Sequence, residues 1–233
     1  MSFPTVLSRT KTGDGTNAAA STSVSVGFSS PASGDLLLAV LSIMENADFP
    51  LTLPTGWVQL SSTVERTGSQ VQVVAYKVCT GSEGTSAVFT ATGAVQFCAI
   101  AYLIQSGTYS SVPVISTAAK NGTANPNPPL LSSGFGVSDT LWLAVFSTDH
   151  NENSVTAWPS GYNNTGSLYH GGSFNLPVMG YAEATATTAS EDPGAFTLNT
   201  AREWIANTIA IQGLATATST PAFGRYGVRG PVR

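Results

Sequence analysis

Two histidines and thirteen acidic residues are the side chains from which a catalytic or metal site could be built. His150 lies in the polar segment Asp149-His150-Asn151-Glu152, whereas His170 stands alone. A zinc site needs three or four converging ligands, and the sequence contains no such spacing. A calcium site made from Asp149, Glu152 and backbone carbonyl oxygens is the alternative that this segment leaves open. We expect solvated loop residues here, with no bound metal and no other cofactor.

Hydrolytic chemistry would require a different set of residues. Glycosidases use two carboxylates that flank a cleft. The acids that could supply such a pair are Glu83, Glu183, Glu191, Asp192 and Glu203. The sequence has no Gly-x-Ser-x-Gly elbow, phosphate-binding loop or His-Glu-x-x-His helix. Scattered acids are typical of a sheet protein kept soluble by charges at its strand ends, so we predict that the protein is not an enzyme.

The composition restricts both the fold and the partners. The chain has 233 residues, of which 42% are hydrophobic and only 9% are charged, with a net charge of −4. Disorder is excluded because it needs few apolar residues and many charges, and the acidic balance argues against nucleic-acid binding. A helical bundle needs many more charged residues on its surface, whereas this Ser/Thr-rich composition is typical of half-exposed strands. We therefore predict an all-β protein.

The ends and apolar runs of the chain carry no targeting signal. No segment approaches the roughly 18 apolar residues of a membrane span, so no membrane partner is expected. The N-terminus lacks the basic start and apolar stretch of a secretion signal. We expect a soluble protein made in a cytosol.

Local patterns predict strands and their burial. Val24, Val26 and Phe28 alternate with small polar residues, as in a sheet with one solvated face. Residues 36–43 are almost continuously apolar, as expected for a strand buried on both sides. Breaks containing Gly, including Thr92-Gly93, separate further strands at intervals of about 8–15 residues. The sequence predicts an antiparallel β-sandwich, either jelly-roll or immunoglobulin-like.

An internal repeat organises the chain. Residues 36–42 (LLLAVLS) match residues 141–147 (LWLAVFS) at five of seven positions, an offset of 105. The same offset aligns residues 54–57 with 159–162 and Tyr76 with Tyr181, and it becomes 107 further along, where Phe89-Thr90 meets Phe196-Thr197. We predict a duplicated β-sandwich with repeats at residues 1–110 and 111–214, followed by a tail at 215–233. Two tandem sandwiches and one pseudo-symmetric sandwich both fit this pattern.

The repeat also predicts core residues. Trp142, Trp158 and Trp204 take the places of Leu37, Leu53 and Phe97, so we expect all three tryptophans in the core. Residues 120–136 are rich in Pro, Asn and Gly, and we expect exposed irregular loops there.

The two cysteines, Cys79 and Cys98, take the places of Ala184 and Ile205. Both are therefore expected to pack as small hydrophobic side chains. A disulfide between them is the second alternative.

Trp57 and Tyr162 follow Pro-x-Gly turns in both repeats. One hypothesis makes them stacking platforms for a sugar, as in carbohydrate-binding modules. The other makes them caps of the sandwich core, and we favour this second interpretation.

The last nineteen residues differ from the rest of the chain. Residues 1–214 hold six basic and thirteen acidic residues, a balance of −7, whereas residues 215–233 hold three arginines and no acid. An extended tail of this kind could dock on an acidic neighbouring subunit, because Arg pairs bidentately with carboxylates and aromatic rings anchor apolar contacts. The candidate docking residues are Phe223, Arg225, Tyr226, Arg229 and Arg233. A terminus without a role is the alternative.

Three segments together suggest a family. The succession Gly34-Asp35-Leu36-Leu37-Leu38-Ala39, Pro54-Thr55-Gly56-Trp57 and Tyr76-Lys77-Val78-Cys79-Thr80-Gly81-Ser82-Glu83 resembles a GDLLLA…PxGW…YKVATGSE pattern of uncharacterised structural proteins of tailed bacteriophages and prophages. Cys79 departs from the small residue usual at its position.

The resemblance covers most of the first repeat and implies no catalytic residue. It implies a virion structural protein, foremost a capsid decoration protein that contacts the major capsid protein or other virion subunits. A homo-oligomer is also expected. A tail- or fibre-associated glycan-binding module is the alternative.

Overall fold

The computed structural model describes residues 2–13, 20–44, 51–66, 70–121, 125–149, 154–169, 176–200 and 202–215. These residues form strands, turns and loops without a helix, which confirms the all-β prediction. Accordingly, this part of the chain holds no helix long and apolar enough to cross a membrane.

The first half of the chain contains seven strands. They are β1 (Val6–Thr12), β2 (Ser21–Gly27), β3 (Leu36–Met44), β4 (Leu51–Thr52), β5 (Val58–Arg66), β6 (Gln70–Val78) and β7 (Ser86–Ile104). The main sheet has the antiparallel order β1-β7-β3-β6-β5, while β2 and β4 pair with the N-terminal part of β7. The first strand thus pairs with the end of the last one, β2 with its beginning, and β3 with β6. This nested pairing is that of a jelly roll.

The second half repeats this order with shorter outer strands. Its strands are β8 (Val114–Ile115), β9 (Ala119–Asn121), β10 (Leu131–Ser132), β11 (Ser138–Thr148), β12 (Val155–Ala157), β13 (Asn163–Tyr169), β14 (Val178–Thr188), β15 (Ser190–Glu191), β16 (Thr197–Leu198) and β17 (Trp204–Gln212). The main sheet has the order β13-β14-β11-β17-β8, with β9 also on β17. Two short ribbons, β10–β15 and β12–β16, lie outside it.

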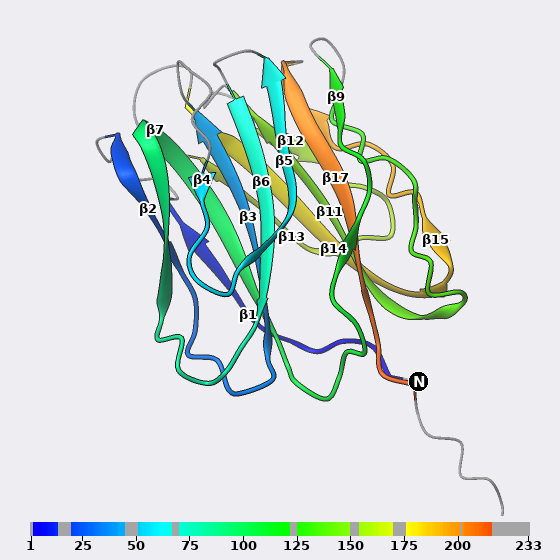
Figure 1. Ribbon diagram of the computed structural model, residues 1–233. Helices are drawn as coiled ribbons and strands as arrows, with labels where there is room; N and C mark the ends of the chain where they lie inside the picture. Colours follow the sequence, from blue (N-terminus) through cyan, green and yellow to red (C-terminus); the bar gives the residue numbers. More distant parts are fainter. Residues whose placement is uncertain are drawn as a thin grey trace, which may run out of the picture.

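The two main sheets stack face to face (Figure 1), and three hydrophobic layers hold the structure together. The inner core lies between the main sheets and takes side chains from β3, β6 and β7 and from β11, β14 and β17. The first outer core lies between the first main sheet and its outer strands, and the second outer core covers the other main sheet. Each half is therefore a sandwich of its own, and the halves pack through their main sheets. This arrangement combines the two alternatives that the repeat left open.

Strand β3 shows how the sequence sets this layering. Leu36, Leu38 and Val40 enter the inner core, whereas Leu37 and Leu41 enter the first outer core. All five are fully buried, which confirms the prediction of a strand covered on both sides. Full burial of one such side chain contributes about 1.5–3 kcal/mol.

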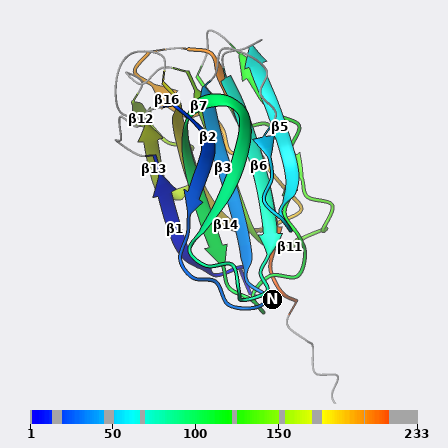
Figure 2. The same cartoon turned by 60° about the vertical axis from the view of Figure 1, so that its left-hand side comes forward.

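Strand β7 joins two layers, contrary to the prediction of separate strands. Its residues 86–91 pair with β2 and β4, and its residues 96–104 pair with β3. The pairing with β2 shifts in register between Ser21 and Ser23, opposite the Thr92-Gly93 segment. The predicted break is thus a bend at which the strand passes from the outer layer to the main sheet, visible as the arc of β7 in Figure 2.

The strand orders of the two halves correspond, as a duplication predicts, and the duplication itself stays a prediction. The registers correct one detail. Leu38 pairs with Tyr76, and its counterpart Leu143 pairs with Glu183, which lies 107 residues after Tyr76. Tyr181 is therefore not the structural counterpart of Tyr76. A two-residue slip keeps every side chain on its own face of the sheet, which explains why such a change is tolerated.

The second outer core includes the predicted tryptophans and also part of segment 120–136, which was expected to be exposed. Trp142 and Trp204 are buried in the second outer core and Trp158 packs against it, which confirms that prediction. In the segment expected to be exposed, Pro126, Pro128 and Leu131 are buried, so the expectation was wrong for these residues. The second half has only short outer strands, and this segment covers the apolar face that they leave open.

The close contact between Gly180 and Phe146 predicts that the side-chain volumes at these two positions compensate each other. A Cβ added to Gly180 would lie 2.1 Å from the ring of Phe146. In the first half the matching cross-strand pair is Leu41 with Val73. We predict that Gly180→Val destabilises the protein by about 1–3 kcal/mol through overpacking. Adding Phe146→Leu, which recreates the first-half pair, should restore most of this loss in urea unfolding. Additive effects of the two substitutions would contradict the volume compensation.

Candidate functional site

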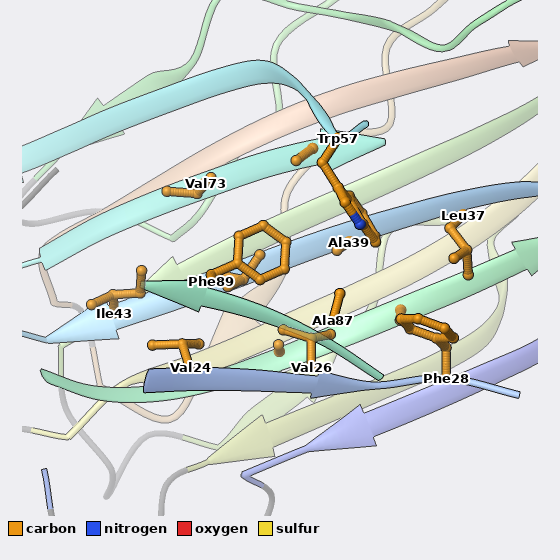
Figure 3. Close-up of a cluster of buried hydrophobic side chains, with 14 of the residues drawn as sticks. Val24, Val26, Phe28, Leu37, Ala39, Ile43, Trp57, Val73, Ala87 and Phe89 are labelled. Atoms are coloured by element: carbon orange, nitrogen blue, oxygen red, sulfur yellow. The ribbon is translucent and has the colours of Figure 1, made fainter. Parts of the chain in front are cut away.

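Segments 34–39, 54–57 and 76–83 meet at one end of the molecule, here called the base, where β3 begins. The turn before β5 is closed by the Trp57 amide, which donates to the Pro54 carbonyl oxygen at 3.1 Å. Gly56 has φ +81°, a conformation that favours glycine. The turn directs the Trp57 indole into the first outer core, 5.3 Å from the Phe89 ring and 6.5 Å from the Phe28 ring (Figure 3).

The corresponding turn of the second half places Tyr162 in the same way. Its amide donates to Pro159 at 3.3 Å, and its hydroxyl donates to Glu191 Oε1 at 3.4 Å. Burial raises the pKa of Tyr162 well above its usual range, and the nearby Glu191 adds to the shift. Trp57 is 9% exposed and Tyr162 is 8% exposed. Sugar stacking needs an open ring face, so this burial favours the core-cap interpretation over the stacking hypothesis.

The Thr80–Glu83 segment folds around one carboxylate. The Thr80 amide and hydroxyl donate to Glu83 Oε1 at 2.7 and 2.9 Å, and the Gly81 amide donates to Oε2 at 2.9 Å. Lys77 Nζ lies 3.2 Å from Oε1. Desolvation opposes ionisation of this carboxyl, but the hydrogen bonds from Thr80, Lys77 and Gly81 outweigh it and lower the pKa of Glu83 to about 2. The motif's acid therefore serves to hold a loop.

Asp35 plays a similar part on the other side of the base. Its carboxylate accepts from the Ala32 and Ser106 amides, both at 2.8 Å, and its side chain is buried. Its carbonyl oxygen accepts from Cys79 at 2.7 Å, which ties the start of β3 to the end of β6. Asp35 thus links the turn at Ala32, the end of β6 at Cys79 and the segment after β7 at Ser106.

A shallow hollow of about 270 Å³ lies beside Trp57. Its lining residues are Phe28, Pro54, Thr55, Trp57, Lys77, Glu83, Ser86, Ala87 and Val88. Because Lys77 and Glu83 are paired with each other and Trp57 is largely buried, the hollow presents few free groups to a ligand. It offers a small contact surface and no pair of unengaged carboxylates.

An ion pair closes one edge between the two main sheets. The Arg9 guanidinium on β1 donates to both carboxylate oxygens of Glu183 on β14, and Asn164 Nδ2 donates to the same carboxylate at 3.2 Å. The Glu183 side chain is 4% exposed. The hydrogen bond to Glu183 raises the pKa of Arg9. Beside this pair, the ring of Tyr102 packs edge-on against Tyr181, with 6.1 Å between ring centres. The group has the geometry of a clamp between halves.

The two cysteines do not form a disulfide, which rules out that alternative, and both side chains are buried, which confirms their packing as small hydrophobic residues. Cys79 lies at the base in the first outer core, and Cys98 faces the inner core. Cys98 pairs with Ser42, six residues along β3 from Leu36 at the base, so roughly 20 Å separates their levels in the sheet. Desolvation raises the pKa of Cys79 to about 11.

Several predicted site residues lie outside the described part of the chain. These are His150, His170 and Glu152 of the metal hypotheses, and the tail residues Phe223, Arg225, Tyr226, Arg229 and Arg233. Among the described residues no group of three or more His, Cys, Asp or Glu side chains could hold a metal ion. Of the candidate acids, Glu83, Glu183 and Glu191 have separate partners on different elements, and Asp192 directly follows Glu191.

Sequence reasoning missed the Arg9–Glu183 clamp. The available signal was the phase of β14, in which Met179 and Tyr181 face the inner core and Glu183 continues the same alternation. A charged residue in an inward-facing position requires a partner, and the sequence alone did not identify which basic residue would supply it.

Comparison with protein-family models, curated proteins and solved structures finds no match to this chain.

The Glu83 loop predicts a pH dependence of stability. The pKa of Glu83 is about 2 in the folded protein and ordinarily 4.5. Its contribution is therefore complete above about pH 4.5 and disappears as the pH falls towards 2. We predict that Glu83→Gln lowers the free energy of unfolding by about 1 kcal/mol at pH 7 and by less near pH 3. Urea unfolding at several pH values measures this, and a difference independent of pH would contradict it.

The clamp predicts a strongly non-additive pair of substitutions. Arg9→Met leaves the Glu183 carboxylate buried without its cation, and we expect a loss of about 3–5 kcal/mol. The double variant Arg9→Met/Glu183→Met removes both charges and should recover most of that loss. Chemical denaturation of the two single variants and the double variant tests this. A loss below about 1 kcal/mol for Arg9→Met would mean that the pair behaves as an exposed salt bridge.

Proposed function

We propose that the protein is a non-enzymatic structural protein of a bacteriophage virion that decorates the head by docking on the major capsid protein or another virion subunit. The observation that carries this proposal is the structural role of the polar residues in the phage-like pattern. Its polar residues Asp35, Lys77 and Glu83 are engaged in bonds that hold loops at the base. Because these polar side chains already bond to neighbouring loops, they favour a structural role over a role in catalysis or ligand recognition.

The position of the chain ends supports docking through the base. The Ser2 amide donates to the Leu214 carbonyl oxygen at 3.2 Å, so the tail begins beside the N-terminus (Figure 1). The proposed docking arm, residues 215–233 with its three arginines, therefore starts at the base. Basic and aromatic residues on an extended segment fit an acidic subunit with apolar depressions.

Cosedimentation with purified heads that lack this protein tests the proposal. The full chain should cosediment with the heads, and a 1–214 variant should stay in the supernatant with unchanged circular dichroism. As a matched control, replacing Arg225, Arg229 and Arg233 by lysine keeps the charge and removes bidentate pairing, so attachment should weaken without disappearing. Equal attachment of the 1–214 variant would discard the docking arm. Absence of attachment by the full chain would discard the head as its location.

The alternative function, a glycan-binding module of a tail or fibre, has the hollow beside Trp57 as its support. The burial of Trp57 and Tyr162 weighs against it. Glycan-array binding by the full chain that disappears in Val88→Asp, a change at the rim of the hollow, would favour this alternative over decoration.

A further inference from the structure

The end of the inner core opposite the base carries polar side chains on both main sheets. In the first main sheet, β3 contributes Ser42 and β6 contributes Gln70 and Gln72, each in the inward phase of its strand. In the second main sheet, β11 contributes Ser147 and β17 contributes Asn207, again in the inward phase. All five side chains are at most 1% exposed. We call these five residues the interior polar cluster.

The pairing of the strands places these side chains next to one another. Ser42 lies directly opposite Gln72, a position that brings two Cβ atoms to about 4.5–5.5 Å, and Gln70 is the next inward residue of β6. Gln72 Nε2 donates to Ser147 Oγ at 3.2 Å and so joins the two main sheets. Asn207 is the diagonal neighbour of Ser147 in the pairing of β11 with β17. The cluster therefore reaches from one main sheet to the other.

Five polar atoms of this cluster have no hydrogen-bond partner among the described residues. Asn207 Nδ2 donates to the Ser116 carbonyl oxygen at 3.0 Å, but Asn207 Oδ1 is unpaired. The other four are Ser42 Oγ, Gln72 Oε1 and both side-chain polar atoms of Gln70. Folded proteins pair almost all of their buried polar atoms, either within the protein or with ordered water. Unpaired atoms on four neighbouring residues therefore indicate a bound partner.

The chemistry of these atoms fits water. Three of them are amide oxygens, which accept hydrogen bonds, one is the amide nitrogen of Gln70, which donates, and the Ser42 hydroxyl does either. A water molecule both donates and accepts, so it serves every one of these groups, whereas a cation binds only the oxygens. The five residues of the cluster include no carboxylate that would neutralise a cation.

The central strands leave room for water at this level. In the inward phase of β3, Val40 is followed by Ser42, and in that of β11, Val145 is followed by Ser147. Packed sheets lie about 10 Å apart, and a serine side chain fills less of that space than a valine does. Because a buried water makes about three hydrogen bonds, five unpaired atoms require more than one water.

We propose that the interior polar cluster is a hydration site, in which ordered water molecules bridge the two main sheets beside the Gln72–Ser147 hydrogen bond. The site lies at the end of the inner core away from the base, and it does not depend on the function proposed above.

Magnetic relaxation dispersion of oxygen-17 water tests this proposal, because it detects waters that stay inside a protein for longer than its tumbling time. Gln70→Met keeps the length of the side chain and removes both of its polar atoms. The dispersion amplitude of this variant should fall by the equivalent of about one water or more. Gln59→Met is the matched control, because it is the same substitution at an exposed position of β5, and it should leave the amplitude unchanged.

Ser42→Ala is a second variant, which removes a single hydroxyl and should also lower the amplitude. Circular dichroism verifies that each variant folds. Equal amplitudes for the parent chain, Gln70→Met and Ser42→Ala would overturn the proposal. A higher urea midpoint in NaCl or KCl than in choline chloride at equal ionic strength, abolished by Gln70→Met, would overturn it in favour of a monovalent cation.

Discussion

The burial of β3 and β11 on both faces is the constraint on which the rest of the structure depends. Each strand supplies alternate side chains to the inner core and to an outer core, so neither half of the chain can be removed without exposing an apolar sheet face. Covering the outer faces then requires β2, β4 and the bent β7 in the first half. In the second half the short ribbons and the proline-rich segment around Leu131 do the same work. A protein with 9% charged residues can be stable in this form because apolar burial, rather than surface ion pairs, holds its layers together.

The inner core changes character along its length. Near the base it is apolar, with Leu36, Ile104 and Ile211 buried. Towards the other end, Ser42, Gln70, Gln72 and Ser147 occupy the same phase of their strands, and Gln72 Nε2 donates to Ser147 Oγ at 3.2 Å. The side-chain amide of Gln70 and the hydroxyl of Ser42 have no hydrogen-bond partner among the described residues. A buried unpaired polar group costs about 1–3 kcal/mol, so without the proposed water these groups lower the stability of this end of the inner core.

Hydrophobic patterns within single strands predicted the strands and their burial well. The register and the side-chain contacts between strands could not be predicted from these patterns. The apolar run of residues 36–43 and the alternation at Val24 and Val26 predicted burial correctly, because strand periodicity is a local property. The slip at Tyr181 escaped the repeat analysis because sequence alignment follows residue identity, whereas register follows cross-strand pairing. The Arg9–Glu183 clamp joins residues 174 positions apart, a distance over which one sequence holds no pairing information.

The apolar end of the inner core is also the end at which segments 34–39, 54–57 and 76–83 meet. In the function that we propose, residues 215–233 act as a docking arm, and such an arm holds the body in place only where its attachment point is rigid. At the base, Asp35 and Glu83 hold the loops, and Gly213 admits the N-terminal segment against the last strand. The tail thus follows a last strand that is tied to the N-terminal segment at the apolar end of the inner core. The polar layer of Ser42, Gln70, Gln72 and Ser147 lies at the opposite end of the inner core, away from the contact that we propose with another virion subunit.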